Sequence, residues 1–305
     1  MGIMKLKRSV EDRSHIVGCS SLGMYMGVST YGTLHDAWAE YTGKQKEFTP
    51  EQQERLDMGH ALEDFIAREA GKKYKVRLQK SNYAYADTNH PFIICHPDRL
   101  LVKEIDGKRI AVEIKSSSAY DSRWGKPETD EVPMDYLCQT QGYFICGVPC
   151  DEVWLIRFSN NQITRYIIRP DQELMDAIVK KVGEVVEKFD SGWEPGPSTY
   201  EEAQKIFADV AEDPIEADKD ALQIVQKLSS VREQIKNLQT EEDTLKAALV
   251  ASMKGHATLT LSGSPIVTYT SVTQNRFDAK KFEKDHPDLY GKYIRTTSFN
   301  KLSIK

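Results

Sequence analysis

The sequence predicts an α/β protein with a helical C-terminal region, and three observations carry this prediction. Residues 92–118 read as two strands joined at Asp106-Gly107, because this dipeptide between apolar runs is typical of a hairpin turn. Residues 217–253 keep apolar side chains alternately four and three positions apart, which is typical of a long helix that packs against another. Apolar residues at helical spacing also predict helices over 33–41, 49–70, 133–146 and 171–189.

Composition places the chain among ordinary water-soluble proteins. It has 305 residues, of which 40% are apolar and 29% charged, enough for one large core with an appendage or for two domains. No run approaches the roughly 18 apolar residues of a membrane span, and the charged N-terminus lacks the apolar core of a secretory signal. Five cysteines, an odd number, favour reduced thiols. The spacing of Cys138, Cys146 and Cys150 fits no common iron–sulfur pattern. We therefore expect a cytoplasmic protein without membrane contact.

A stretch rich in glycine and proline, residues 192–198, predicts a linker. We expect a core over 1–198, a helical, coiled-coil-like arm over 199–255 and a small α+β region over 256–305. Residues 210–305 contain 14 basic and 13 acidic side chains, which leaves 27 and 33 for residues 1–209. The net negative charge therefore lies on the first part, and a nucleic-acid substrate would require a local basic patch there.

The first part begins with a segment rich in glycine and serine, residues 13–31, whose amides and hydroxyls can receive a phosphate together with Arg13. A short helix follows over 33–41. Thr49 with Gln52 forms a capping box, so a second helix is predicted from Thr49 to about Ala70, ended by Gly71. Its predicted buried face consists of Leu62, Phe65, Ile66 and Ala70.

Glu63 lies at the edge of that buried face, where its carboxylate can point either into a cleft or into solvent. A strand is predicted within residues 75–85. The first strand of the hairpin then starts at Phe92, and Ile110, Val112 and Ile114 give the second strand one apolar face.

The other face of the second strand carries Glu113 and Lys115, and Asp98 lies near the first strand. A hairpin can bring the two carboxylates together. Phosphodiester hydrolysis needs an activated water and stabilised phosphate charge, and Mg²⁺ provides both while preferring carboxylate, carbonyl and water oxygens. Asp98, Glu113 and the carbonyl of Ile114 could hold the ion, and Lys115 could orient or help to deprotonate the water. The alternative is an exposed strand with an ordinary Glu/Lys pair.

Residues 121–130 are predicted to form a loop, and Pro133 opens a helix to about Cys146. Tyr136, Gln139 and Tyr143 lie on one face of that helix. This face can bind a phosphate or a base edge, or it can pack against another helix. A hairpin over 153–158 and 163–169 follows, and then a helix over 171–189.

The C-terminal pattern includes Ile224, Leu228, Val231, Ile235, Leu238, Leu245 and Leu249, with Glu242 as the single break. It indicates a coiled-coil hairpin partner, a self-association arm or a docking helix. Residues 256–305 predict a hairpin, a short charged helix over 278–285 and a basic, tyrosine-containing end.

Five short motifs in order resemble the lambda-type alkaline exonuclease family, also called YqaJ-like viral recombinases, of the PD-(D/E)XK nuclease superfamily. They are Arg13 with Ser20 in RSHIVGCS, Glu63 in GHALE, Asp98 in HPD, Glu113 and Lys115 in EIK, and Tyr136 with Gln139 in YLCQTQ. The resemblance covers residues 13 to about 170. It implies a restriction-endonuclease-like core, with a mixed sheet flanked by helices.

The resemblance also implies roles for these residues. Asp98, Glu113 and the Ile114 carbonyl would bind one or two Mg²⁺ ions, for which Mn²⁺ could substitute. Glu63 would complete the metal site, and Lys115 would serve the nucleophilic water. Arg13, Ser20, Tyr136 and Gln139 would contact DNA and its phosphates. Many members have a serine where this chain has His96, which could still donate to phosphate and would add pH dependence near its ordinary pKa. His60 lies on the face of Glu63 and is either its partner or solvated.

The activity implied is metal-dependent 5′→3′ digestion of one strand from double-stranded DNA ends, in phage-type recombination within a bacterial host. The implied partners are a single-strand annealing protein and further copies of the chain in a ring around the duplex. Two other interpretations stay open: a structure-specific or defence DNA endonuclease on the same fold, and a non-catalytic DNA-binding scaffold that acts through its coiled-coil arm.

Overall fold

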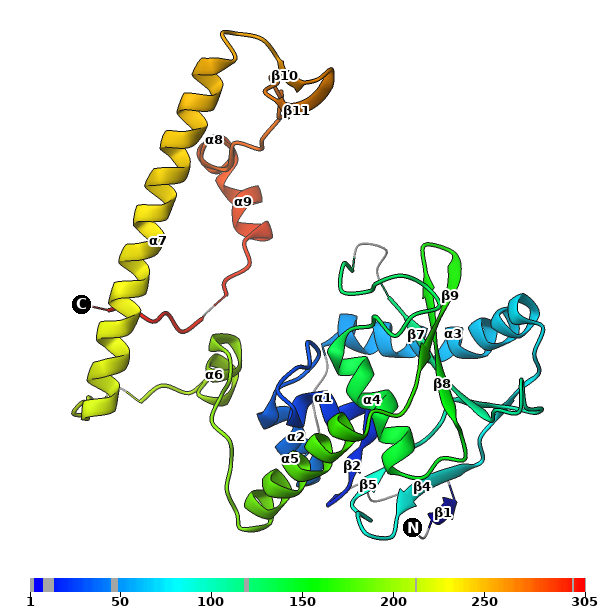
Figure 1. The fold of residues 1–305 in the computed structure, drawn as a ribbon. Helices are drawn as coiled ribbons and strands as arrows, with labels where there is room; N and C mark the ends of the chain where they lie inside the picture. The colour runs from blue at the N-terminus through cyan, green and yellow to red at the C-terminus, as the bar shows by residue number, and fades with distance from the viewer. Residues whose placement is uncertain are drawn as a thin grey trace. The chain divides into compact units, whose positions relative to one another are not determined.

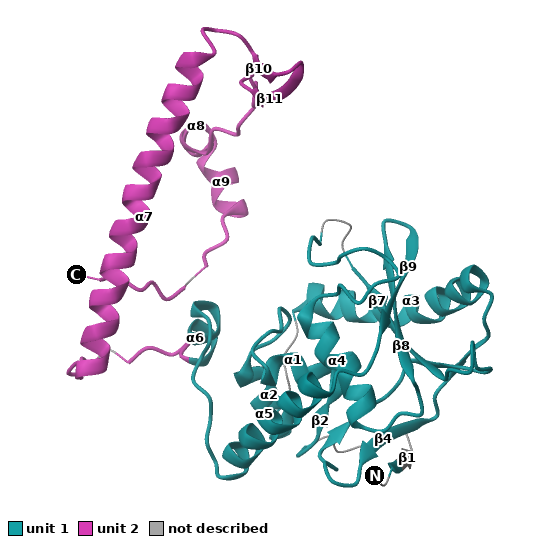
Figure 2. Cartoon of the chain, in the orientation of Figure 1, with its two compact units in different colours: residues 1–206 teal, residues 207–305 magenta. Residues whose placement is uncertain are grey.

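The structure is a computed structural model, and it describes residues 3–7, 14–44, 49–117, 121–211, 213–297 and 299–304. The chain forms two compact units, residues 1–206 and residues 207–305 (Figures 1 and 2). Arg13 lies outside the described residues.

The first unit is built on a five-stranded sheet of β3 (Leu78–Lys80), β6 (Arg99–Leu101), β7 (Ile110–Ser116), β8 (Glu152–Ser159) and β9 (Gln162–Ile168). The strands lie in the order β3-β6-β7-β8-β9. β7 and β8 run parallel, whereas the other neighbouring pairs run antiparallel. The predicted α/β fold with a mixed sheet is confirmed.

Helices cover both faces of this sheet (Figure 1). On one face α3 (Pro50–Tyr74) buries Ile66, Ala67 and Ala70 in a cluster with Ile110 and Val112 of β7. On the other face α4 (Met134–Ile145) and α5 (Gln172–Asp190) share a larger apolar cluster with β8 and β9. Successive side chains of a strand point to opposite faces. β7 therefore has the predicted apolar face, which it turns toward α3, and its polar side chains point toward α4.

The turn of the predicted hairpin is confirmed, but its first strand is shorter than expected. Asp106 and Gly107 have φ angles of 52° and 73°, the left-handed conformation of a tight hairpin turn. Ile93–Ile94 does not pair with β7. It forms β5, which pairs in parallel with β2 (Val17–Gly18) in a separate sheet. Pro97 separates β5 from β6, since proline has no N–H to donate to a ladder.

Two predicted helix starts are confirmed by complete capping boxes. Thr33 and Asp36 cap α2 (Leu34–Tyr41), and Thr49 and Gln52 cap α3. In each box the threonine side chain accepts from the third helical N–H, and the third side chain accepts from the N-cap N–H.

The other end of α3 was predicted wrongly. The helix passes through Gly71 and ends at Tyr74, with Lys75 in the left-handed conformation at φ 56°. A glycine inside a helix costs only about 1 kcal/mol, and packing of α3 on the sheet outweighs that cost. Phe65, predicted to be buried, is 41% exposed and contacts Phe158 edge-on.

The remaining elements of the first unit complete its core. The helix predicted after Pro133, the hairpin β8–β9 and the helix α5 are confirmed. Residues 75–85 contribute two strands, β3 and β4 (Tyr83–Asp87), and β4 pairs with β1 (Ile3–Lys7) instead of the central sheet. All five cysteines are free and buried. The shorter helical segments are η1 (Cys19–Ser21), α1 (Leu22–Tyr25) and α6 (Tyr200–Ile206).

The second unit is dominated by α7 (Lys219–Ser252), the predicted long helix. The predicted hairpin follows as β10 (Thr258–Leu261) and β11 (Ser264–Thr268). α8 (Ala279–Asp285) confirms the predicted charged helix, and α9 (Pro287–Tyr293) was not predicted. None of the described helices is both long and apolar enough to cross a membrane.

Candidate active site

A cavity of about 690 Å³ opens in the first unit between α3, the segment before β6, strand β7, α4 and the segment before α1. It gathers candidate residues that lie far apart in the sequence. Those lining it are Ser20, Glu63, His96, Asp98, Glu113, Ile114, Lys115 and Gln139. Tyr136 is not part of the described lining, although it lies against one of these residues.

Asp98 and Glu113 come together because β6 and β7 pair antiparallel next to them, with Arg99 opposite Val112. The Asp98 carboxylate accepts a hydrogen bond from the main-chain N–H of Ile114 at 2.8 Å. Burial raises the pKa of Asp98 well above its usual range, and the charges of Glu113 and Glu63 raise it further. The site therefore carries crowded negative charge in a poorly hydrated place.

Glu113 is buried and held by three donors. Gln139 Nε2 donates to its Oε1 at 2.8 Å, and the Tyr143 hydroxyl donates to its Oε2. Gln139 and Tyr143 lie four residues apart on α4, so one helix face supplies both donors. The Lys115 ammonium also lies 2.7 Å from Glu113 Oε1. These three contacts fix the orientation of the Glu113 side chain.

Lys115 is the cation of the inner cavity. Burial works to lower its pKa, but the charges of Glu113 and Asp98 outweigh that effect and raise the pKa above its ordinary value. Its ammonium also lies 5.2 Å from the ring centroid of Tyr136, a cation–π contact. Lys115 is thus a protonated donor at neutral pH, directed at the carboxylate cluster.

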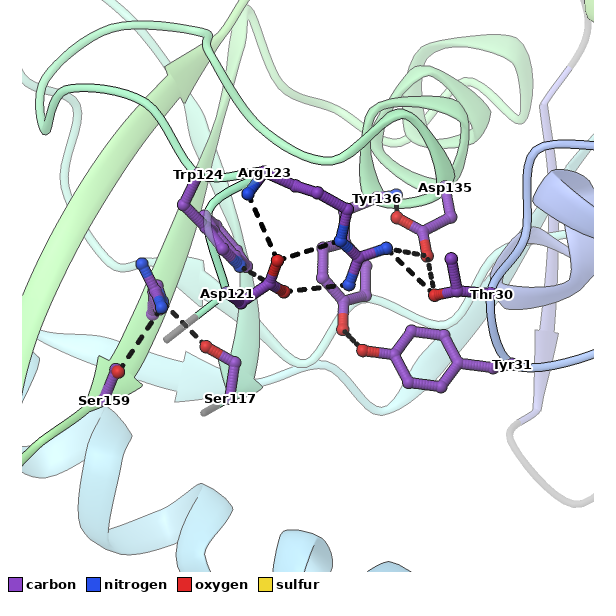
Figure 3. A network of polar contacts seen from close by, with 10 residues as sticks. Thr30, Tyr31, Ser117, Asp121, Arg123, Trp124, Asp135, Tyr136 and Ser159 are labelled. Carbon is purple, nitrogen blue, oxygen red and sulfur yellow. Dashed lines mark hydrogen bonds and ion pairs between the residues drawn. The ribbon is translucent and has the colours of Figure 1, made fainter. Parts of the chain in front are cut away.

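A polar network holds Tyr136 in place (Figure 3), and the ring of Tyr136 lies against the Lys115 ammonium. The hydroxyls of Tyr136 and Tyr31 are hydrogen-bonded at 2.7 Å. Arg123 joins the surrounding loops, since it donates to Thr30 at 2.9 Å and pairs with Asp121 at 2.8 Å. The network ties the segment before α2 to the start of α4, and so fixes Tyr136, which lies against Lys115.

Glu63 reaches the cavity from α3, which decides between its two predicted orientations. Its Oε1 is 2.5 Å from Nη1 of Arg99. The same Arg99 nitrogen donates to the main-chain carbonyl of Asp98 at 2.6 Å. Arg99 is only 3% exposed and pairs with Asp64 as well. It therefore acts as a buried brace between α3 and the strand that follows Asp98.

The open side of the cavity is lined by polar groups of both charges. Arg55 and His60 come from α3, Glu40 from α2, Ser20 from η1 and His96 from the loop between β5 and β6. Ser21 donates to Glu40 at 2.7 Å. This rim can present hydroxyl, imidazole and guanidinium groups to a phosphate while the acidic floor lies deeper.

The oxygen atoms of the acidic side chains at the bottom of the cavity suit a hard divalent cation. Within the described residues no three acidic, histidine or cysteine side chains lie close enough to enclose a metal ion. However, Asp98 and Glu113 offer two carboxylates beside the Ile114 main chain, and oxygen ligands of this kind are those that Mg²⁺ prefers. The raised pKa of Asp98 marks negative charge that a cation would compensate. The residues present therefore fit Mg²⁺.

Two residues that hold the candidate carboxylates in place were not predicted as part of the site. Arg99 braces Glu63, and Tyr143 donates to Glu113. The sequence contains a weak indication of the role of Arg99, because a charged residue inside a short apolar strand requires a buried partner. The position of Tyr143 on the face of Gln139 was visible, but its acceptor was not.

Comparison with known proteins finds similarity to one protein family. Residues 10–147 match the sequence profile of the YqaJ-like viral recombinase domain, which confirms the resemblance drawn from the motifs. Protein YqaJ of Bacillus subtilis (strain 168) is 29% identical over 307 residues, which cover 96% of this chain and 92% of YqaJ.

Two solved structures are similar in fold. An alkaline exonuclease from Laribacter hongkongensis, LHK-Exo, has 16% identity and a TM-score of 0.45, over 59% of this chain and 90% of that chain. A phage-related exonuclease from Haemophilus somnus 129PT has 19% identity and a TM-score of 0.44, over 58% of this chain and 94% of that chain.

Proposed function

We propose that this protein is a metal-dependent exonuclease that digests double-stranded DNA from its ends in the 5′→3′ direction. One observation carries the proposal: Asp98, Glu113 and Lys115 converge in a single cavity. The Asp98 carboxylate accepts a hydrogen bond from the Ile114 main chain, and the Lys115 ammonium forms an ion pair with Glu113. The match of residues 10–147 to the viral recombinase domain supports it. A non-catalytic scaffold would not need this buried, charge-crowded set.

Asp98, Glu113 and the Ile114 carbonyl are the proposed magnesium ligands, and Glu63 completes the site from α3. When bound, the ion would activate a water and stabilise charge on the phosphate oxygens. Arg99 holds Glu63 in place, and Gln139 and Tyr143 hold Glu113. Orienting partners of this kind keep a ligand in its productive position.

Lys115 orients the attacking water in this proposal. Its raised pKa keeps the ammonium protonated at neutral pH, so it donates a hydrogen bond to the water or to a phosphate oxygen. Tyr136 packs against the ammonium and limits its rotamers. Lys115 would therefore provide positive charge that stabilises the phosphate and a hydrogen-bond donor that positions the nucleophilic water.

The strand to be digested would enter through the open side of the cavity. We propose that Ser20 and His96 receive its phosphates there. The family resemblance adds Arg13 and Tyr136 to the proposed DNA contacts. Gln139 uses one of its two N–H groups on Glu113, and an amide nitrogen carries two donors. The second donor is the one proposed for phosphate.

Two proposals about assembly accompany this function, and both rest on the family resemblance. Copies of the chain form a ring around the duplex, which would confine the basic surface needed for DNA to a channel in a protein with net charge −5. A single-strand annealing protein binds the strand that digestion exposes.

Digestion of matched DNA substrates tests the proposed function. Linear duplex with 5′-phosphate ends, the same duplex with 5′-hydroxyl ends and closed circular DNA are incubated with Mg²⁺ or Mn²⁺. The expected result is preferential loss of the 5′-phosphorylated strand and no change in the circles. Cutting of circles would show the endonuclease instead, and no cleavage with either ion would reject the nuclease.

A further inference from the structure

α7 presents to solvent an apolar stripe that is interrupted at Glu242. In this helix, all of whose 34 residues are described, none is buried. Ile224, Leu238 and Leu245 are 66%, 63% and 64% exposed. A surface helix gains most of its stability by burying its apolar face, so this stripe is suited to a partner.

The stripe follows a heptad repeat along the length of the helix. In the notation abcdefg, the a positions are Ala221, Leu228, Ile235, Glu242 and Leu249, and the d positions are Ile224, Val231, Leu238, Leu245 and Ser252. Alternating a and d residues form the seam along which two helices pair. Glu242 is the single charged residue in this seam.

The charges of α7 are divided between its two halves. Residues 219–236 contain four basic and two acidic side chains, whereas residues 237–252 contain one basic and three acidic side chains. Parallel pairing of two such helices would place like charge beside like charge. Antiparallel pairing places each basic half beside an acidic half, and it also aligns the helix dipoles favourably.

We infer that α7 pairs antiparallel with α7 of a second copy of this chain. Centred between residues 236 and 237, this pairing matches every a position with a d position of the partner helix. It sets Glu242 opposite position 231 of the other copy, next to the arginine at position 232. Parallel pairing would instead place the two Glu242 carboxylates against each other in an apolar seam, which is costly. The inference concerns the second unit and does not depend on the proposed nuclease function.

The mass of the full-length chain in solution tests the pairing. The double variant Ile235→Asp/Leu238→Asp places charges at the centre of the seam. The matched control, Ser230→Asp/Asn237→Asp, adds the same charges at c positions away from it. Light scattering is expected to give the wild type and the control twice the mass of the seam variant. Equal masses for wild type and seam variant would overturn the inference.

Disulfide cross-linking tests the orientation without depending on destabilised variants. Val231→Cys and Glu242→Cys chains, carrying tags of different mass, are co-expressed and mildly oxidised. Antiparallel pairing predicts a disulfide between the two different variants and none between two Glu242→Cys chains. Efficient linkage of Glu242→Cys to itself would show parallel pairing, and absence of both products would show a different partner for the stripe. Either result would reject the inference.

Discussion

The Asp98 carboxylate accepts a hydrogen bond from the main-chain N–H of Ile114 at 2.8 Å, although the two residues lie 16 positions apart. This bond fixes Asp98 beside Glu113, so two carboxylates share a buried site and the pKa of Asp98 is raised by burial and by its acidic neighbours. A folded protein that holds an acid in this way sacrifices stability at neutral pH. Such a cost is typical of a site built for a ligand.

Asp98→Asn should therefore stabilise the protein in the absence of divalent metal while abolishing cleavage. The pKa of Asp98 in the folded protein lies above its value in the unfolded chain. The folded state therefore loses stability as pH rises from the unfolded pKa through the folded pKa. Asparagine keeps an acceptor for Ile114 but removes the charge. At pH 7 in a chelator, the midpoint of thermal unfolding should rise by about 2–4 °C, the shift given by about 1 kcal/mol in a domain of this size. Asp130→Asn is the control, and an equal or lower midpoint for Asp98→Asn would contradict the argument.

Lys115→Ala should lower the rate of DNA cleavage by roughly 10²–10³-fold, the loss that follows removal of one preorganised donor. DNA binding, measured by gel shift in a chelator, should change little, because the rim residues remain. The exposed Lys103, on the β6–β7 loop, provides the matched control Lys103→Ala. A cleavage rate for Lys115→Ala equal to that of the control would remove Lys115 from the mechanism.

Tyr143→Phe removes the hydroxyl that donates to Glu113 and leaves the ring in the core. Loss of an orienting partner typically lowers metal affinity or activity by about 10–100-fold. Isothermal titration with Mn²⁺ should show the loss in affinity, with the cleavage rate falling in step. Tyr166→Phe is the control, since its hydroxyl bonds the Gly125 carbonyl instead. Unchanged Mn²⁺ affinity in Tyr143→Phe would show that the hydroxyl has only a packing role.

Asp151 and Arg109 join the starts of the parallel strands β7 and β8, and their pair should give a measurable dependence of stability on pH. Hydrogen bonds from the Arg109 side chain and main chain lower the pKa of Asp151 to about 2. The folded pKa lies below the unfolded one, so the contribution to stability is present above about pH 4 and is lost as pH falls toward 2. The Asp151 side chain is 40% exposed, so solvent screening keeps the contribution of this pair to the free energy of unfolding below about 1 kcal/mol.

Urea unfolding of wild type and Asp151→Asn from pH 2 to pH 7 measures this contribution. The wild type should be more stable at neutral pH, and the two curves should converge in acid. A difference that grows as pH falls would contradict the assignment.

Local chemistry made much of this fold predictable. The alternation along β7, the capping boxes at Thr33 and Thr49 and the turn at Asp106-Gly107 depend on neighbouring residues only, and all are present. The end of α3 was missed because packing on the sheet outweighed the local signal of Gly71. β5 was misplaced because nothing near Ile93 indicates that its partner is β2.

The candidate site also divides into features that local sequence specifies and features that depend on tertiary packing. The positions of Asp98 and Glu113 followed from a hairpin, so the sequence was sufficient to pair them. The donors that orient Glu113 lie 26 and 30 residues away on α4. Their acceptor depends on how that helix packs on the sheet, which no local pattern specifies. Arg99 follows Asp98 directly, yet its pairing with Glu63 also required the tertiary arrangement.

The most direct test of the central claim is the rate of nucleotide release from linear double-stranded DNA by wild type and Glu113→Gln, with Glu104→Gln as the matched control. Glu104 is exposed on the loop between β6 and β7, whereas Glu113 is buried in the cavity. Mg²⁺-dependent release is expected from wild type and the control, and none from Glu113→Gln. Equal release by Glu113→Gln, or none by wild type with Mg²⁺ or Mn²⁺, would contradict the central claim.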